Sequence, residues 1–164
     1  MIRAMSTPTS TYTLRRGTVA DIPTLVEFRL AMFQEIGTPG NYELMAPAYE
    51  TWLQREMPPE TYRTWVIEDV SGRLVAVAGL VLHVRAPGPR GIEPYQGYVS
   101  SVYVLPEHRL RGLARRLMEV IHDVCRTEGV RIVNLHASDA GRALYASMGY
   151  VATDEMRLVL EPVQ

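Results

Sequence analysis

The sequence predicts an α/β fold built on a single mixed sheet, mostly antiparallel, with helices on both faces. Two observations predict this fold class. Apolar residues recur at helical spacing in some segments and form short buried runs in others, in the order β-α-α-β-β-β-α-β-α-β. The chain has 164 residues without an internal repeat or a linker, which is enough for one packed core. We therefore expect one domain over residues 11–164, preceded by a flexible tail at residues 1–10.

The first half of the chain predicts five elements. Asp21 stands at the N-cap position of the first helix, and Gly37 ends that helix. Two buried runs around a turn at 71–73 are typical of a β-hairpin, and Gly79 indicates a bulge in its second strand. The predicted bounds are a strand at 12–18, helices at 20–37 and 46–57, and strands at 64–70 and 74–84.

The second half begins with a loop at 86–94 that is too rich in Pro and Gly for regular structure. A long helix with an apolar stripe ends at Gly129, and a short helix is N-capped by Ser138 and closed by Gly149. The predicted bounds are a strand at 95–104, a helix at 110–128, a strand at 129–137, a helix at 138–148 and one or two strands at 150–161.

The composition excludes several classes of function. The formal net charge is −1, so no global field attracts nucleic acid or an anionic membrane. All 17 basic residues are Arg, which removes Lys as a base, a nucleophile or a phosphate ligand. Cys125 is the single cysteine, so we expect no disulfide, no metal and a cytoplasmic location. The longest apolar run, at 74–84, is too short to cross a bilayer.

The stretch HRLRGLARRLM at 108–118 places four arginines around Gly112, where a strand gives way to a helix. The small residues Gly112 and Ala114 would let an anion approach the unpaired N–H groups of the helix start. A nucleic-acid patch is disfavoured because acidic residues interrupt the basic surface. A solvated helix face explains Arg115 and Arg116 but not the arginines that precede the first turn. Neither a P-loop nor a GxGxxG motif is present.

Two motifs resemble signatures of the GCN5-related N-acetyltransferase (GNAT) family. Residues 109–114, RLRGLA, resemble the family's [RQ]-x-x-G-x-[GA] pyrophosphate loop, after a strand that ends in V-x-P-E and before a long helix. Residues 143–150, ALYASMGY, resemble its second signature, and the order of predicted elements matches over nearly the whole chain. The resemblance implies an acyl-CoA N-acyltransferase fold with splayed central strands. It also implies transfer of an acetyl group from acetyl-CoA to a primary amine by direct attack on the thioester.

The resemblance also implies which residues bind acetyl-CoA, the acetyl-donor substrate. The backbone of the 109–115 loop would hold the pyrophosphate, and the edge of the 95–104 strand would hold the pantetheine arm and supply oxyanion donors. Ser138 stands near the expected pantetheine arm, although its role as an N-cap explains it equally well. The implied binding residues are Val102, Tyr103, Val104, Arg109, Leu110, Arg111, Gly112, Leu113, Ala114, Arg115 and Ser138.

Tyr145 matches the family tyrosine that gives a proton to the departing CoA thiolate; alternatively, it only packs beside its helical neighbours. The general base is not assigned. Many family members have a carboxylate where this chain has Ser100, and Ser101 beside it cannot act as a base alone. An amine with a pKa near 10.4 is neutral in only about one molecule in 2,500 at pH 7. Three possibilities stay open: a water chain through Ser100 and Ser101, a carboxylate elsewhere such as Glu35 or Glu93, or an acceptor of low pKa that needs no base.

The acceptor is not identified by the sequence. The loops at 38–47 and 85–96 would flank it, where Glu43 and Glu93 could attract a cationic amine. Three alternatives stay open: a longer acyl-CoA, a protein N-terminus as acceptor, or a catalytically silent acyl-CoA-binding domain. The expected partner is a small-molecule or peptide amine, with no nucleic acid and no membrane. Homodimers are common in the family, but no residue here argues for one.

Overall fold

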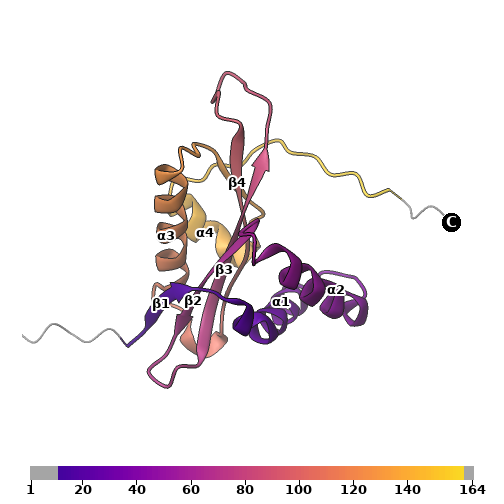
Figure 1. Ribbon diagram of the computed structural model, residues 1–164, viewed down its shortest axis with the longest axis vertical. Helices are drawn as coiled ribbons and strands as arrows, with labels where there is room; N and C mark the ends of the chain where they lie inside the picture. Colours follow the sequence, from indigo (N-terminus) through magenta and orange to yellow (C-terminus); the bar gives the residue numbers. More distant parts are fainter. Residues whose placement is uncertain (1–10, 161–164) are drawn as a thin grey trace, which may run out of the picture.

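The computed structural model describes residues 11–160 and contains a five-stranded sheet between two layers of helices (Figure 1). Strands β1 to β4 form an antiparallel meander, and β5 joins β4 in parallel. This confirms the predicted mixed, mostly antiparallel sheet. The tail predicted at 1–10 lies outside the described residues. The strands are β1 Thr13–Arg16, β2 Tyr62–Glu68, β3 Leu74–Val84, β4 Tyr95–Val104 and β5 Val133–Leu135.

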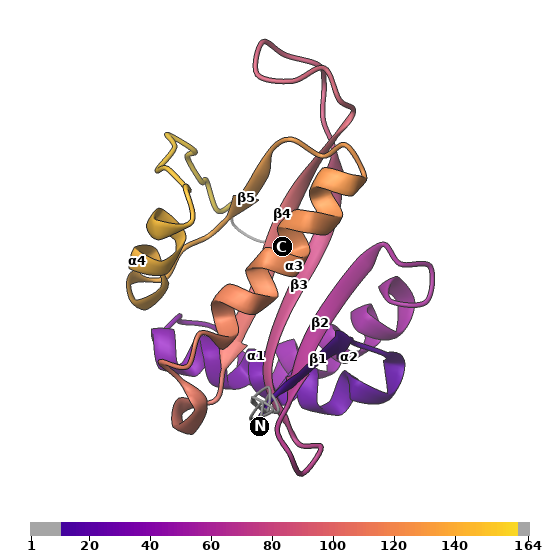
Figure 2. The same cartoon turned by 90° about the vertical axis from the view of Figure 1, so that its left-hand side faces the viewer.

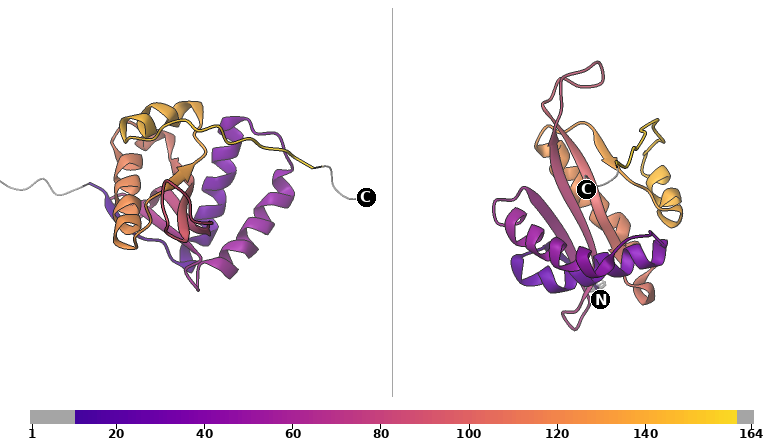
Figure 3. Two further views of the ribbon diagram at one scale, coloured as in Figure 1. Left: turned by 90° about the horizontal axis from the view of Figure 1, so that it is seen from above. Right: turned by 90° about the vertical axis from the view of Figure 1, so that its right-hand side faces the viewer.

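Four helices cover the sheet, two on each face (Figures 2 and 3). One layer consists of α1 (Ile22–Ile36) and α2 (Tyr42–Glu56). The other consists of α3 (Leu113–Thr127) and α4 (Asp139–Ser147). Short 3-10 helices, Val19–Asp21 and Pro106–His108, precede α1 and follow β4. Helices on both faces were predicted, and the structure confirms them.

The sheet separates two apolar cores. On one face, Leu117, Met118 and Ile121 of α3 are fully buried against the sheet. On the other face, residues of α1 and α2 surround Tyr62 and Val66 of β2. The middle strand β3 is buried from residue 74 to residue 80, as a continuous apolar run requires when both faces are covered.

Helix α2 begins four residues before the predicted start at residue 46. The side chain of Asn41 caps it by accepting a hydrogen bond from the backbone N–H of Leu44 at 3.0 Å. The predicted start placed Pro47 in the first turn, where proline is favoured, but the structure holds Pro47 inside the helix. A good N-cap therefore decided the boundary, and the proline was tolerated.

The strands predicted at 150–161 are wrong over the part that the structure describes. Residues 150–160 have no regular secondary structure, and the segment runs away from the body of the molecule (Figure 1). Its apolar side chains are exposed, among them Met156, Leu158 and Leu160. An alternating pattern forms a strand only where an edge pairs with its backbone, and the described ladders do not include this segment. Residue 161 lies outside the described part.

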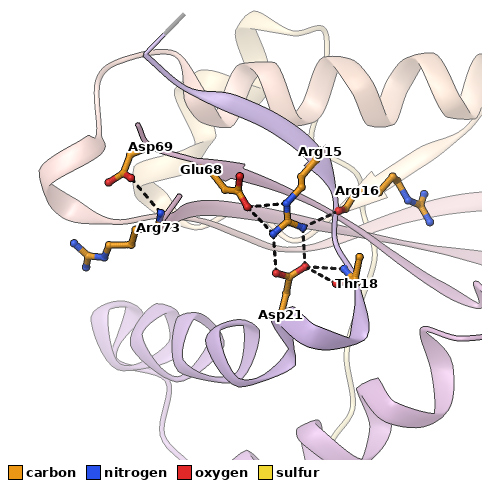
Figure 4. A network of polar contacts seen from close by, with 7 residues as sticks. All are labelled: Arg15, Arg16, Thr18, Asp21, Glu68, Asp69 and Arg73. Carbon is orange, nitrogen blue, oxygen red and sulfur yellow. Dashed lines mark hydrogen bonds and ion pairs between the residues drawn. The ribbon is translucent and has the colours of Figure 1, made fainter. Parts of the chain in front are cut away.

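An ion-pair network joins β1, β2 and the start of α1 (Figure 4). Both terminal nitrogens of Arg15 donate to the carboxylate of Asp21 at 2.8 Å, and its Nε donates to Glu68 at 2.7 Å. Asp21 also accepts from the backbone N–H of Thr18 at 2.7 Å. Asp21 does occupy the N-cap position of α1, as predicted, but its side chain makes no capping bond to that helix and pairs with Arg15. The hydrogen bonds from Arg15 lower the pKa of Asp21, against an opposing effect of burial.

We expect Asp21→Asn to lower the free energy of unfolding by about 2 kcal/mol at pH 7, because it leaves the Arg15 charge without its best partner. The pKa of Asp21 is lower in the folded than in the unfolded chain. Its stabilisation is therefore complete above the unfolded value of about 3.9 and is lost as the pH falls through the folded value. Urea unfolding of both proteins at several pH values checks this.

Asp123→Asn is the matched control, because Asp123 pairs with Arg126 on the exposed surface of α3. Its effect should stay within about 0.5 kcal/mol. A difference between wild type and Asp21→Asn that grows on acidification would contradict the assignment.

Candidate active site

The two central strands diverge at the middle of the sheet. Strand β5 pairs with β4 only where Gly97, Tyr98 and Val99 lie beside Val133–Leu135. Strand β3, on the other side, stays paired with β4 as far as Val104. Beyond Val99 the second edge of β4 therefore has no strand of the described residues 11–160 beside it, while β5 runs on toward α4 (Figure 2). The predicted splay of the central strands is confirmed.

A bulge in β4 lies at the start of this free edge. Ser100 is opposite Gly79 and Tyr103 is opposite Val77, so two residues of β4 face the single residue between them on β3. The bulged residue Ser101 has a φ of 55°, in the left-handed region. The sequence indicated a bulge at Gly79 of β3, whereas the extra residue lies on the neighbouring strand β4. Gly79 itself is required because a Cβ there would overlap the ring of Tyr62.

The bulge changes which face of the sheet the following side chains meet. Side chains alternate along a strand, so one extra residue reverses the pattern. Val99 packs in the core beneath α3, whereas Tyr103 packs in the core beneath α1 and α2. Ser101 contacts α1, where its hydroxyl accepts a hydrogen bond from Arg29 at 2.6 Å. Ser100 lines the same side, beside Arg29 and α2, so the bulge places two adjacent hydroxyls on the α1–α2 side of β4 where the sheet opens.

Helix α3 begins at this opening without a side-chain cap. Gly112 occupies the N-cap position with a φ of 76°, and a Cβ there would meet nothing within 4 Å. The first backbone bond of the helix runs from Arg116 N–H to the Gly112 carbonyl at 3.1 Å. The N–H groups of residues 113–115 therefore have no partner within the helix. Leu110 also has a positive φ, 58°, and is fully exposed. This open helix start can receive an anion.

The arginines of the 109–115 loop contact protein groups. Arg109 donates to the Val104 carbonyl at 2.9 Å and to Glu35 at 2.6 Å, which fixes the loop to β4 and α1. Arg115 donates to the Ser147 hydroxyl at 2.6 Å and so joins α3 to α4. Arg111 makes a longer contact, 3.3 Å, with a backbone carbonyl. The arginines add positive charge near the helix start while they hold its surroundings in place.

Tyr145 of α4 is 8% exposed and belongs to the same apolar cluster as Leu113 of α3. Val102 and Val104 pack against that cluster, so the free edge, the helix start and the tyrosine share one neighbourhood. Burial raises the pKa of Tyr145, and its hydroxyl makes no hydrogen bond within residues 11–160. The phenol is therefore protonated at neutral pH.

Ser138 caps α4, as predicted, by accepting a hydrogen bond from the backbone N–H of Gly141 at 3.2 Å. Gly141 allows close packing, because a Cβ at this position would come within 2.8 Å of the Tyr145 ring. The glycine lets the Tyr145 ring pack back against the first turn of α4, which Ser138 caps. A role of Ser138 toward acetyl-CoA stays a prediction.

The candidate bases are committed to other partners. Glu35 accepts hydrogen bonds from Tyr103 at 2.7 Å and from Arg109, and these bonds, the Tyr103 bond first, lower its pKa. Burial and Glu35 raise the pKa of Tyr103 to about 12. Glu93 pairs with Arg131 at 3.0 Å. A carboxylate of lowered pKa is a poor proton acceptor at pH 7, so Glu35 is not suited to act as a general base. The carboxylate of Glu93 is held by its ion pair with Arg131.

A cavity of about 370 Å³ lies between α1, α2 and β4. Arg29 and Ser100 form two of its walls, and one face of α2 forms the rest. The sequence did not single out Arg29 or Tyr49 as residues of a site. The cavity-lining residues 45, 48, 49 and 52 could have been recognised as one face of α2 from their helical spacing. The complete lining is Arg29, Met45, Ala48, Tyr49, Trp52 and Ser100.

An open sheet whose splayed strands meet an uncapped helix start defines an acyl-CoA N-acyltransferase class of protein. The sequence profile of the acetyltransferase (GNAT) family matches residues 25–150, and the chain belongs to this family. A GCN5-related N-acetyltransferase from Ralstonia eutropha JMP134 has a similar structure, with a TM-score of 0.86 and 30% identity. That similarity covers 91% of this chain and 98% of the other.

Two further relatives extend the comparison. A predicted acetyltransferase from Clostridium acetobutylicum, solved with acetyl-CoA, has a TM-score of 0.83 and 20% identity, and the match covers 91% of this chain and 96% of that one. N-acetyltransferase Eis of Mycobacterium tuberculosis is 28% identical over 68% of this chain. The chain spans only 29% of the length of that relative.

No helix within residues 11–160 is long and apolar enough to cross a membrane. In the same part of the chain, no group of three or more His, Cys, Asp or Glu residues could hold a metal ion.

Proposed function

We propose that this protein transfers the acetyl group of acetyl-CoA to the primary amine of a small-molecule or peptide acceptor. One observation carries the proposal: the unpaired edge of β4 lies beside the uncapped start of α3. We propose further that residues 11–164 form one acetyltransferase domain that works in the cytoplasm. The bound acetyl-CoA of the Clostridium relative supports the choice of donor.

The geometry fits acetyl-CoA at two places. The N–H groups of residues 113–115 and the exposed backbone around Leu110 would bind the pyrophosphate, with charge from Arg109 and Arg111. The free edge at Val102 to Val104 would pair with the pantetheine arm as an added strand does. The Val104 carbonyl already accepts a bond from Arg109, so we expect this pairing to depend chiefly on the residues before it. Acetyl-CoA supplies the activated thioester.

Tyr145 would donate a hydrogen bond to the leaving CoA sulfur. A thiol has an ordinary pKa of about 8.5, and the pKa of a free phenol is about 10. Burial raises the pKa of Tyr145 further, so full proton transfer is uphill, and a hydrogen bond or concerted donation is the favoured role. Ser100 and Ser101 cannot act as bases alone, and Glu35 is committed to other partners. We therefore propose no base and expect the amine to reach the site uncharged.

We expect Gly112→Asp to weaken acetyl-CoA binding at least about tenfold, because a carboxylate at the helix start repels the pyrophosphate. Gly112→Asn is the matched control: both side chains tolerate a positive φ, and they differ only in charge. Calorimetric titration with acetyl-CoA measures both. Equal affinities for the two variants would refute the pyrophosphate site.

We expect Tyr145→Phe to lower kcat at least about 100-fold while the Kd for acetyl-CoA changes less than about threefold. Tyr150→Phe is the control, because Tyr150 contacts the Tyr145 ring but its hydroxyl pairs with His122 at 2.8 Å. Released thiol is measured with polyamines, amino acids, aminoglycosides and short peptides as acceptors. The same assay with longer acyl-CoAs and with peptide N-termini tests those alternatives. Acetyl-CoA binding without turnover on any acceptor would indicate a silent domain.

We also propose a homodimer, because the exposed segment at 151–160 carries apolar side chains that a second copy could cover. Light scattering after size exclusion should give twice the monomer mass for the wild type. The double variant Leu158→Ser with Leu160→Ser should elute as a monomer of unchanged thermal stability. A monomeric wild type would contradict this expectation.

A further inference from the structure

Arg29 of α1 is held in one orientation at the wall of the α1–α2–β4 cavity. Its guanidinium lies 4.5 Å from the centre of the Tyr49 ring and 4.9 Å from that of Phe33. One terminal nitrogen donates to the hydroxyl of Ser101 at 2.6 Å. Stacking and a single hydrogen bond fix the plane of the guanidinium and leave most of its five donors unused.

The charge of Arg29 has no counter-ion within residues 11–160. No carboxylate pairs with it, although Arg15, Arg63 and Arg109 each pair with at least one. The cavity lining contains no Asp or Glu. Tyr49 does not supply a negative charge, because burial raises its pKa and keeps the phenol protonated. Holding a half-buried cation without a counter-ion costs free energy, and an anionic ligand would remove that cost.

The cavity also adjoins the place where the sheet opens. Ser100 forms one wall, and it is the first residue of β4 beyond the pairing with β5. Ser101, the bulged residue, binds Arg29 directly. A ligand in the cavity would therefore lie on the α1–α2 side of β4, next to the edge proposed for the thioester. Met45, Ala48 and Trp52 give this ligand an apolar surface.

We propose that this cavity binds the acceptor and that Arg29 recognises an anionic group on it, so that the acceptor is an amine that also carries a carboxylate or a phosphate. The inference rests on the proposed transferase function and adds the substrate class. A planar guanidinium suits either anion, because both accept two parallel hydrogen bonds. Polyamines are disfavoured, since they would bring positive charge to Arg29 with nothing to offset it. Glu43 and Glu93, which the sequence offered as attractors of a cation, do not line the cavity.

The test uses acceptor pairs that differ in the anionic group alone: phenylalanine against phenylalaninamide, and glucosamine 6-phosphate against glucosamine. We expect the wild type to have a kcat/KM at least about tenfold higher for the anionic member of one pair. Arg29→Met should lose this preference through KM, and Arg29→Lys should retain part of it. Equal kcat/KM values within both pairs would overturn the proposal.

A binding measurement separates this inference from the proposed reaction. N-acetylphenylalanine, which cannot react, should bind the wild type in calorimetry and should bind Arg29→Met at least about tenfold more weakly. Acetyl-CoA affinity and thermal unfolding of Arg29→Met should match the wild type, which controls for loss of the contact with Ser101. Ser101→Ala removes that contact and leaves the charge, so it should keep the anion preference.

The two proposals fail in different ways. Binding of N-acetylphenylalanine without turnover of any acceptor would refute the transferase and leave the anion site standing. The anion site alone would be refuted by two results together. Neutral and anionic acceptors would be turned over alike, and N-acetylphenylalanine and N-acetylglucosamine 6-phosphate would bind weakly, with affinities that Arg29→Met does not change.

Discussion

Beyond Val99, strand β4 has a hydrogen-bonding partner on one side only, and the rest of the site depends on that missing pair. A sheet edge presents backbone donors and acceptors that need partners. Here β5 leaves the edge within a few residues and continues toward α4, the helix that carries Tyr145. The helix start at Gly112 lies at the end of the same strand, after a single 3-10 turn. One divergence of two strands thus brings together a free edge, an uncapped helix and a buried phenol.

The electrostatics of the two sides of β4 differ. On the α3 side the positive field comes from backbone N–H groups and a helix dipole, which side-chain substitution cannot easily remove. On the α1–α2 side it comes from one guanidinium held by two aromatic rings and one hydroxyl. Glu35 bears a negative charge beside β4, but Tyr103 and Arg109 both donate to its carboxylate. The site therefore favours anions on both faces, through different physical means.

The sequence predicted the sheet, its two helical layers and the glycine-led start of α3, because these depend on local patterns. Buried runs specify strands, helical spacing specifies faces, and Gly112 suits a positive φ. Three features depend on distant residues and could not be read locally. The bulge at Ser101 is visible only in the register of β4 against β3. Asp21 follows a capping pattern but pairs with Arg15 instead. The segment at 150–160 contains the short apolar run of residues 158–160, yet it lies beside no edge in the described structure.

The bulge at Ser101 has a consequence for how such a protein can change. The bulge reverses the alternation within one strand, so side chains on the two sides of it pack against different helical layers. The backbone edge of β4 is a separate feature from the side chains that face α1 and α2. Substitutions in α1 and α2 can reshape the α1–α2–β4 cavity while the peptide groups of the free β4 edge stay in place. A deletion of one residue from β4 would exchange the two faces at once. Point mutation is therefore a gradual route to new selectivity in this fold, and a change in strand length is an abrupt one.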